Sequence, residues 1–147
     1  MATLQLRVIS QEEELFSGKV DIVLVPGPEG QLGILPNHAP LIAHLSIGEL
    51  IARAGDEEYA FAVHGGFVHV LPDEVIVLAD TAERVEEIDV ERAEQARQRA
   101  LEMLEKSPPP EERRLTEIAL RRSRVRLKLA RERRRRRRRR PQISQSE

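Results

Sequence analysis

The pattern of apolar residues changes near residue 87, and this change determines what each part of the chain can fold into. Residues 4–81 contain short apolar or alternating runs separated by turn-forming residues, whereas residues 88–132 are rich in Ala, Glu, Arg and Leu. The charge changes as well: residues 1–87 hold 4 basic and 15 acidic side chains, and residues 111–147 hold 16 basic and 5 acidic ones. The 147-residue chain is therefore expected to combine a part made of strands with a part made of helices.

The first part of the chain predicts a β-structure. Apolar and β-branched runs alternate with turn clusters that contain Gly, Pro and Asp, and all four aromatic residues lie before residue 70. Strands are expected at residues 4–9, 19–25, 41–45, 49–53, 59–63, 67–71 and 75–78. This spacing is typical of an all-β sandwich or a flattened barrel.

The later part of the chain predicts two helices. Residues 88–106 consist mainly of strong helix formers, Asp89 is a suitable N-cap, and the prolines at 108–110 end the helix. A second helix is expected from Glu111, so that residues 88–132 form an antiparallel hairpin. Because its apolar stripe is mostly alanine and buries little area, we expect this hairpin to be only marginally stable by itself.

Eight consecutive arginines occupy residues 133–140. Like charges at this density repel one another, so residues 133–147 are predicted to form a solvated, disordered tail. The expected domains are thus a β-sandwich at 1–87, a helical hairpin at 88–132 and this arginine-rich tail.

The composition excludes several classes of protein. The chain contains no cysteine, which rules out disulfides, thiolate metal sites and a thiol nucleophile, and which fits a reducing compartment. No apolar stretch approaches the ~18 residues that span a bilayer, and residues 1–10 lack the features of a secretory signal. We therefore expect a soluble protein that is not exported.

Motifs for catalysis and for metal binding are missing from the sequence. There is no Gly-x-Ser-x-Gly elbow, no His-Glu-x-x-His and no complete Gly-x-x-x-x-Gly-Lys-Ser/Thr loop. The four histidines lack the spacing that would direct two rings at one metal ion. Gly27, Gly30 and Gly33 precede an extended, proline-limited segment, which favours tight turns over a phosphate cradle. We expect a protein that is not an enzyme and holds no metal or cofactor.

Three segments carry a distinctive order of residues. The glycines up to residue 33 precede Ile-Leu-Pro-Asn-His-Ala-Pro at 34–40, His-Gly-Gly-Phe-Val-His-Val lies at 64–70, and Ile-Asp-Val-Glu-Arg-Ala lies at 88–93. With these segments the chain resembles the epsilon subunits of bacterial F-type ATP synthases. The resemblance extends from about Leu4 to Leu129.

The resemblance implies a sandwich of about ten strands followed by an antiparallel helical hairpin. It also implies a non-catalytic subunit of the central stalk, or rotor, peripheral to the cytoplasmic face of the bacterial cell membrane. Such a subunit binds the gamma subunit and the c-ring and regulates ATP hydrolysis. In the family, the loop equivalent to residues 31–38 faces the c-ring, so Gln31 and His38 are expected to contact it. Alternatively, His38 only closes a turn between Pro36 and Pro40.

The resemblance further implies ATP as a regulatory ligand. In some epsilon subunits, Ile/Leu-Asp-x-x-Arg-Ala forms one half of an ATP site, and Ala-Leu-x-Arg-Ala-x-x-Arg-Leu on the second helix forms the other. Residues 88–93 match the first sequence, and residues 119–127 match the second except at Ser123. The residues assigned to ATP by this resemblance are Glu83, Ile88, Asp89, Arg92, Ala93, Arg99, Arg122 and Arg126.

The spacing of the four arginines is compatible with such a site. Arg92 and Arg99 share one face of the first helix, and Arg122 and Arg126 share one face of the second. Converging guanidiniums repel one another unless a polyanion such as ATP neutralises them. The alternative needs no ligand: Asp89 caps the helix, and the arginines form a solvated face.

A regulatory mechanism follows as a hypothesis. Abundant ATP holds the weak hairpin closed, and when ATP falls the hairpin opens and its basic second helix docks on the catalytic alpha/beta head. The alternative function is a module that binds nucleic acid or another polyanion through the basic C-terminal region. Because no aromatic residue accompanies the basic region, nucleic acid is not the expected partner.

Overall fold

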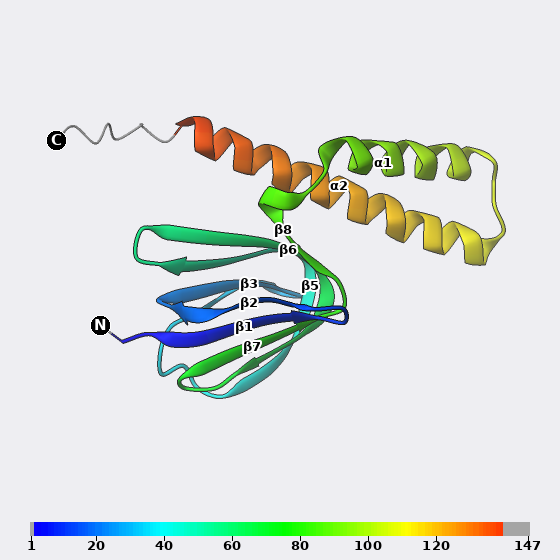
Figure 1. Ribbon diagram of the computed structural model, residues 1–147. Helices are drawn as coiled ribbons and strands as arrows, with labels where there is room; N and C mark the ends of the chain where they lie inside the picture. Colours follow the sequence, from blue (N-terminus) through cyan, green and yellow to red (C-terminus); the bar gives the residue numbers. More distant parts are fainter. Residues whose placement is uncertain (1, 140–147) are drawn as a thin grey trace. The chain divides into compact units, whose positions relative to one another are not determined.

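The computed structural model describes residues 2–139, which divide into two compact units. The first unit ends at Glu87 and contains the strands, and the second begins at Ile88 and contains the helices (Figure 1). None of the helices in the described part of the chain combines the length and the apolar character needed to cross a membrane.

Eight strands build the first unit. They are β1 (Leu4–Ser10), β2 (Glu14–Val20), β3 (Ile22–Gly27), β4 (Gly30–Ile34), β5 (Leu41–Ala54), β6 (Glu57–Val70), β7 (Glu74–Ala79) and β8 (Ala82–Arg84). Their order is β2-β1-β7-β6-β5-β3-β4, with β8 paired to β6, and a 3-10 turn, η1 (Val85–Glu87), follows. β1 and β7 run parallel to each other, and the other strand pairs are antiparallel.

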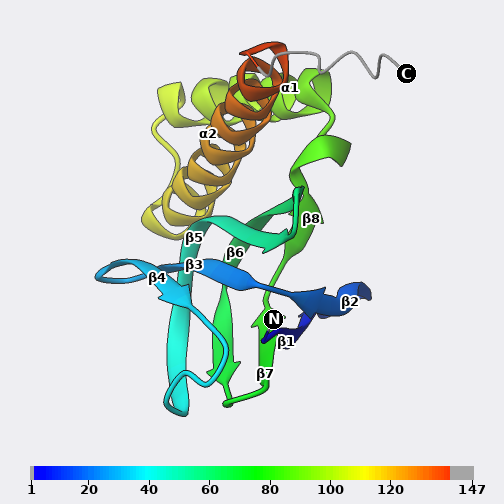
Figure 2. The same cartoon turned by 90° about the vertical axis from the view of Figure 1, so that its left-hand side faces the viewer.

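The long strands β5 and β6 belong to both layers of the sandwich (Figures 1 and 2). Each has 14 residues, and they pair along their whole length, from Leu41 opposite Val70 to Ala54 opposite Glu57. β6 pairs with β8 near its start and with β7 near its end, and the end of β5 pairs with β3. Buried Leu, Ile, Val and Phe side chains fill the interior. The prediction of an all-β sandwich is confirmed.

The sandwich has eight strands, although about ten are expected. The predicted strands at 41–45 and 49–53 are parts of β5, and those at 59–63 and 67–71 are parts of β6. Glycine at residues 65 and 66 is a turn signal in the sequence, but here the two residues have φ angles of 82° and 119° within a continuous strand. Glycine tolerates these angles, so β6 bends without interruption.

The second unit is a hairpin of two helices, α1 (Val90–Glu105) and α2 (Pro110–Arg139). Asp89 caps α1, because its Oδ1 accepts a hydrogen bond of 3.1 Å from the backbone N–H of Arg92. The chain turns at Ser107, which has a φ of 48°, and the following prolines separate the helices. Both the predicted hairpin and the predicted N-cap are confirmed.

Small side chains of α1 lie at the contact between the helices. Ala93 and Ala100 of α1 are buried, as are Leu120, Ser123 and Leu127 of α2. Burying a methyl group contributes only about 0.8 kcal/mol, compared with ~1.5–3 kcal/mol for a leucine side chain, so the alanines of α1 stabilise the hairpin less than the leucines of α2 do. An ion pair adds to it, since Nη2 of Arg131 donates a hydrogen bond of 2.8 Å to Oε1 of Glu94.

Helix α2 extends to Arg139, although the sequence predicts a disordered tail from residue 133. Arginine is a good helix former, and extending an existing helix costs far less than nucleating one, so the helical hydrogen bonds continue into the arginine run. The structure thus differs from the prediction at residues 133–139. The rest of the predicted tail, residues 140–147, lies outside the described residues.

Candidate functional site

One side of the hairpin carries the two α1 arginines assigned to ATP. Arg92 and Arg99 are seven residues apart and share a face of α1, with Ala96 between them. A groove of about 350 Å³ lies along this face. It is lined by Ala96, Arg99, Ala100, Met103, Leu115, Thr116 and Ala119. This face of α1 therefore adjoins the side of α2 that carries Leu115 and Ala119.

The same side of α2 carries the other two arginines. Leu115 and Ala119 line the groove together with Arg99. Three and seven residues after Ala119, Arg122 and Arg126 continue along the same side of the helix. We call this side the Arg92 flank, and it is defined by Arg92, Arg99, Arg122 and Arg126.

The remaining residues assigned to ATP occupy two different units. Ile88 and Ala93 are buried at the start of the helical unit, and Asp89 lies between them as the N-cap. Glu83 belongs to the sandwich unit, where it is half-buried on β8 opposite Ala62 of β6. On the Arg92 flank, Arg126 is half-buried and the other three arginines are exposed.

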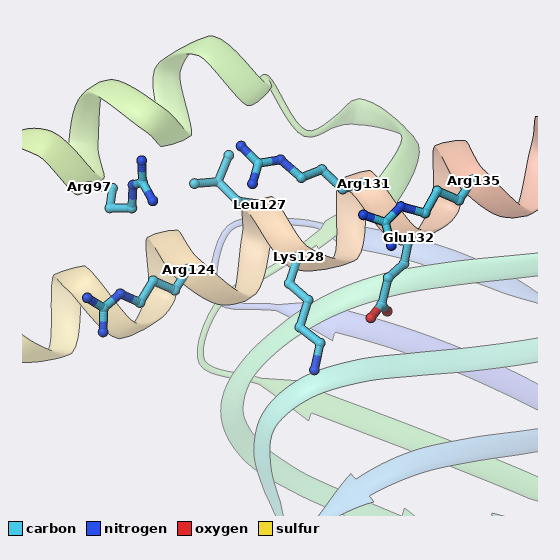
Figure 3. Close-up of a pocket in the computed structure, with 7 residues that line it drawn as sticks. All are labelled: Arg97, Arg124, Leu127, Lys128, Arg131, Glu132 and Arg135. Atoms are coloured by element: carbon cyan, nitrogen blue, oxygen red, sulfur yellow. The ribbon is translucent and has the colours of Figure 1, made fainter.

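A second set of cations, which sequence reasoning missed, lies on the other side of the hairpin (Figure 3). It surrounds a pocket of about 260 Å³. The pocket is lined by Arg97, Arg124, Leu127, Lys128, Arg131, Glu132 and Arg135. We call this side the Arg124 flank, and it is defined by Arg97, Arg124, Lys128, Arg131 and Arg135.

The Arg124 flank is only partly neutralised. Arg131 pairs with Glu94, and Glu132 is the one carboxylate that lines the pocket. The Nε of Arg97 is buried and has no hydrogen-bond partner in the part of the chain that the structure describes. A sequence signal for this flank exists, because Arg124, Lys128, Arg131 and Arg135 follow at helical spacing. The first three lie within the predicted hairpin, and Arg135 was expected in a disordered tail.

Gln31 and His38 lie on and just after β4 in the sandwich unit. Gln31 is exposed and lines a pocket of about 430 Å³. His38 is half-buried, its backbone N–H donates a hydrogen bond of 3.2 Å to the carbonyl of Leu35, and its ring Nδ1 lies 2.8 Å from the carbonyl oxygen of Ala39. The backbone of His38 thus closes a turn, while the side chain of Gln31 faces solvent.

Exposed apolar side chains cross three strands of the sandwich. Phe67 of β6 lies opposite Leu78 of β7 on one side and His44 of β5 on the other, and the Phe67 and His44 rings are 4.7 Å apart. Phe67 is 48% exposed, Leu78 50% and Ile42 of β5 68%. We call Ile42, Phe67 and Leu78 the apolar row. Contiguous exposed apolar residues are typical of protein interaction surfaces.

Tyr59 of β6 has a shifted pKa and belongs to the framework of the sandwich. Within residues 2–139, no three His, Asp or Glu side chains are positioned to hold a metal ion together. The pKa of Tyr59 is raised because its hydroxyl donates a hydrogen bond to the Glu57 carboxylate, and because desolvation and the charge of Glu57 also favour the protonated form. The Tyr59 ring packs at 4.8 Å from that of Phe16, so this group stabilises the sandwich.

Both units match models of known protein domains. Residues 3–85 match the family described as ATP synthase, Delta/Epsilon chain, beta-sandwich domain. Residues 86–131 match the family described as ATP synthase, Delta/Epsilon chain, long alpha-helix domain. The two matches follow each other along the chain and leave only its ends uncovered.

Curated relatives carry the name ATP synthase epsilon chain. A relative from Dehalococcoides mccartyi strain BAV1 is 50% identical over 127 residues, which cover 86% of this chain and 91% of the relative. A relative from Moorella thermoacetica is 48% identical over 127 residues, which cover 86% of this chain and 95% of the relative. The similarity therefore spans nearly all of these proteins.

Solved structures of ATP synthases contain chains of similar fold. A chain in the Euglena gracilis mitochondrial ATP synthase, in a structure of OSCP, F1 and the c-ring, matches with a TM-score of 0.71 and 28% identity, covering 82% of this chain and 76% of that one. A chain in the central stalk and c-ring of the Tetrahymena thermophila mitochondrial enzyme matches with a TM-score of 0.50 and 15% identity. The match covers 57% of this chain and 68% of that one. At this low identity, the second match supports the fold alone.

These similarities agree with the architecture of the two units. The protein is a non-catalytic subunit of the ATP synthase rotor, in the central stalk. The similar proteins give no support to the alternative of a nucleic-acid-binding module. Because family models match both of its domains and a curated relative is 50% identical to it, the chain belongs to the ATP synthase delta/epsilon family.

Proposed function

We propose that this subunit joins the gamma subunit to the c-ring on the cytoplasmic side of a bacterial membrane, and that its hairpin regulates ATP hydrolysis in response to ATP. The assignment of partners is supported by the Euglena structure, which contains F1 and the c-ring. The ATP response is supported by the Arg92 flank, which is the single observation that carries it.

The sandwich unit offers a separate surface for each partner of the stalk. The apolar row suits a partner with an apolar surface, because burying its three side chains removes exposed apolar area from water. We assign this row to the gamma subunit. Gln31 and His38 offer polar groups and are assigned to the polar loops of the c-ring.

The Arg92 flank suits a triphosphate because two guanidiniums come from each helix. Charge-assisted hydrogen bonds from guanidinium to phosphate are roughly twice as strong as neutral ones, and a planar guanidinium binds two phosphate oxygens at once. A ligand held by both helices favours the closed hairpin. Ile88, Asp89 and Ala93, which lie where α1 begins, are proposed to shape the nucleoside side.

A weak hairpin allows occupancy of this site to act as a switch. A ligand that binds only the closed form stabilises it by about 2.7 kcal/mol at 100 times its dissociation constant, which is comparable to the full burial of one leucine side chain. When ATP is scarce, this stabilisation disappears and the hairpin opens. The basic helix α2 then docks on the alpha/beta head and blocks wasteful hydrolysis.

Small-angle scattering of the full chain tests the ATP response. We expect ATP to reduce the radius of gyration, since a closed hairpin is more compact than an open one. Arg92→Ala and Arg126→Ala should each abolish the reduction. Arg121→Ala is the matched control, because Arg121 is exposed on α2 but lies off the Arg92 flank, and it should compact like the wild type. A scattering profile that saturating ATP leaves unchanged would rule the switch out.

A further inference from the structure

We infer that the Arg124 flank is a second anion-binding site, and that it takes a compact oligophosphate of two or more linked phosphates. The site shares no residue with the Arg92 flank, so it does not depend on the proposed ATP site. It uses residues from both helices, with Arg97 on α1 and the other four cations on α2 (Figure 3).

The cations of α2 form a continuous stripe. Arg124, Lys128, Arg131 and Arg135 follow at steps of four, three and four residues, which places them on one side of the helix. From the first to the last the stripe extends for about 16 Å at 1.5 Å per residue. The stripe includes Arg135 only because α2 continues into the arginine run. The arginine run thus supplies one of the cations of the proposed anion site.

The pocket carries an excess of positive charge, which favours the binding of an anion. Five cations surround it, and Glu132 and Glu94 supply two negative charges, of which Glu94 is engaged by Arg131. The buried Nε of Arg97 has no partner among the described residues, and leaving such a donor unsatisfied is costly. A phosphate oxygen accepts a strong, charge-assisted hydrogen bond from a guanidinium N–H, and the negative charge of phosphate would offset the repulsion among the neighbouring cations.

The shape of the pocket favours a small anion over a polymer. Its volume is about 260 Å³, and Leu127 is its one apolar lining residue. Nucleic-acid sites normally combine cations with aromatic rings that stack on bases, and the chain has no aromatic residue after Phe67. Two or more linked phosphates present several oxygens to several guanidiniums within a short length. A free oligophosphate and the phosphate chain of a nucleotide both have this chemistry.

Occupancy of the Arg124 flank is expected to close the hairpin. An anion that is held by Arg97 and by the stripe of α2 bridges the two helices, so it binds the closed form better than the open one. The hairpin would then respond to phosphate anions on both of its sides.

Calorimetric titration of the full chain with tripolyphosphate at fixed ionic strength tests this site. The Arg122→Gln/Arg126→Gln background removes two cations of the Arg92 flank, and we expect binding to persist there. Adding Arg97→Gln and Arg124→Gln should weaken it at least about tenfold, or about 1.4 kcal/mol. Circular dichroism checks that the helices are retained, and Arg135→Gln, an exposed position, serves as a milder variant with a smaller loss.

Several results would overturn the inference. Loss of tripolyphosphate binding in the Arg122→Gln/Arg126→Gln background would assign the anion to the other flank. Equal binding with and without Arg97→Gln and Arg124→Gln would show that the pocket takes no part. Much tighter binding of a single-stranded oligonucleotide at the same residues would replace the small anion by a polymer. In the same background, ATP that binds like tripolyphosphate identifies a nucleotide as the source, and weaker ATP binding identifies a free oligophosphate; both support the site.

Discussion

Among single residues, Gly66 is the position where a side chain is least compatible with the fold. Its φ of 119° lies where residues with a side chain are rarely found, and a Cβ would collide with the carbonyl oxygen of Leu78 on β7. Leu78 is also opposite Phe67 in the apolar row, so this close approach fixes the strand register that presents the row. The backbone conformation that glycine allows at residue 66 is therefore needed to form the surface that is assigned to gamma.

We predict that Gly66→Ala lowers the free energy of unfolding of the full chain by about 3 kcal/mol, from the forced φ and the collision together. Urea unfolding followed by circular dichroism measures this change. Gly33→Ala is the control, because a Cβ there would meet Leu24 Cδ2 at an ordinary 3.5 Å, and it should change the stability by less than about 0.5 kcal/mol. Equal effects of the two substitutions would show that the bend in β6 accepts a side chain.

At the scale of elements, local signals predicted the helices well and the strands less completely. The start of α1 was predictable because Asp89 caps it within three residues of its own position, and its end because prolines follow. β2 was not predicted apart from its last two residues, which the sequence joined to β3, and it is held by pairing with β1. The short strands β4 and β8 were not predicted either, since they carry few apolar residues and are held by pairing with β3 and β6. Their existence depends on partners distant in sequence.

The two cationic flanks show the same limit. Helical spacing predicted that Arg92 and Arg99 share a face, and it would equally have found the stripe from Arg124 to Arg135. Only the last member of the stripe, Arg135, fell outside the predicted helix, because repulsion within the arginine run was expected to outweigh the helix propensity of arginine. Which side of α1 adjoins which side of α2 depends on packing, and a single sequence does not contain it.

We predict that Asp89→Ala lowers the stability of the hairpin by about 1 kcal/mol without nucleotide, because it removes the acceptor for the Arg92 N–H. The measurement is the melting of the helical signal in circular dichroism. Asp89→Asn keeps a capping oxygen and should retain most of the stability. If Asn proves as destabilising as Ala, the charge of Asp89 and not its hydrogen bond stabilises α1.

On the scale of the whole molecule, two units of different stability lie in one chain. The sandwich has a core of fully buried Leu, Val, Ile and Phe side chains, whereas the helices bury few large apolar side chains, namely Leu120, Leu127 and Leu129, beside alanines and a serine. Because apolar burial is the main source of stability, the hairpin is the unit that opens at lower cost. A regulatory role requires such a difference, since a subunit must keep its partners while one part of it moves.

Hydrogen exchange of the full chain should therefore separate the two units. We predict that amides of α1 and α2 exchange through openings of lower free energy than amides of β6, which pairs on both sides. Mass spectrometry of peptic fragments measures this difference. Comparable protection of the helices and of β6 in the absence of ligand would contradict a weak hairpin.

The position of β1 in the sheet has a consequence for biosynthesis. β1 is synthesised before the other strands of this sheet, yet it lies between β2 and β7, with Gln5 opposite Glu74 in a parallel pair. A nascent chain can form the β1–β2 hairpin early, but one edge of β1 stays unpaired until β7 has been translated. During that interval the edge is open to pairing with other chains. Pairing of β7 with β1 is therefore the step that protects this edge of the nascent chain from aggregation.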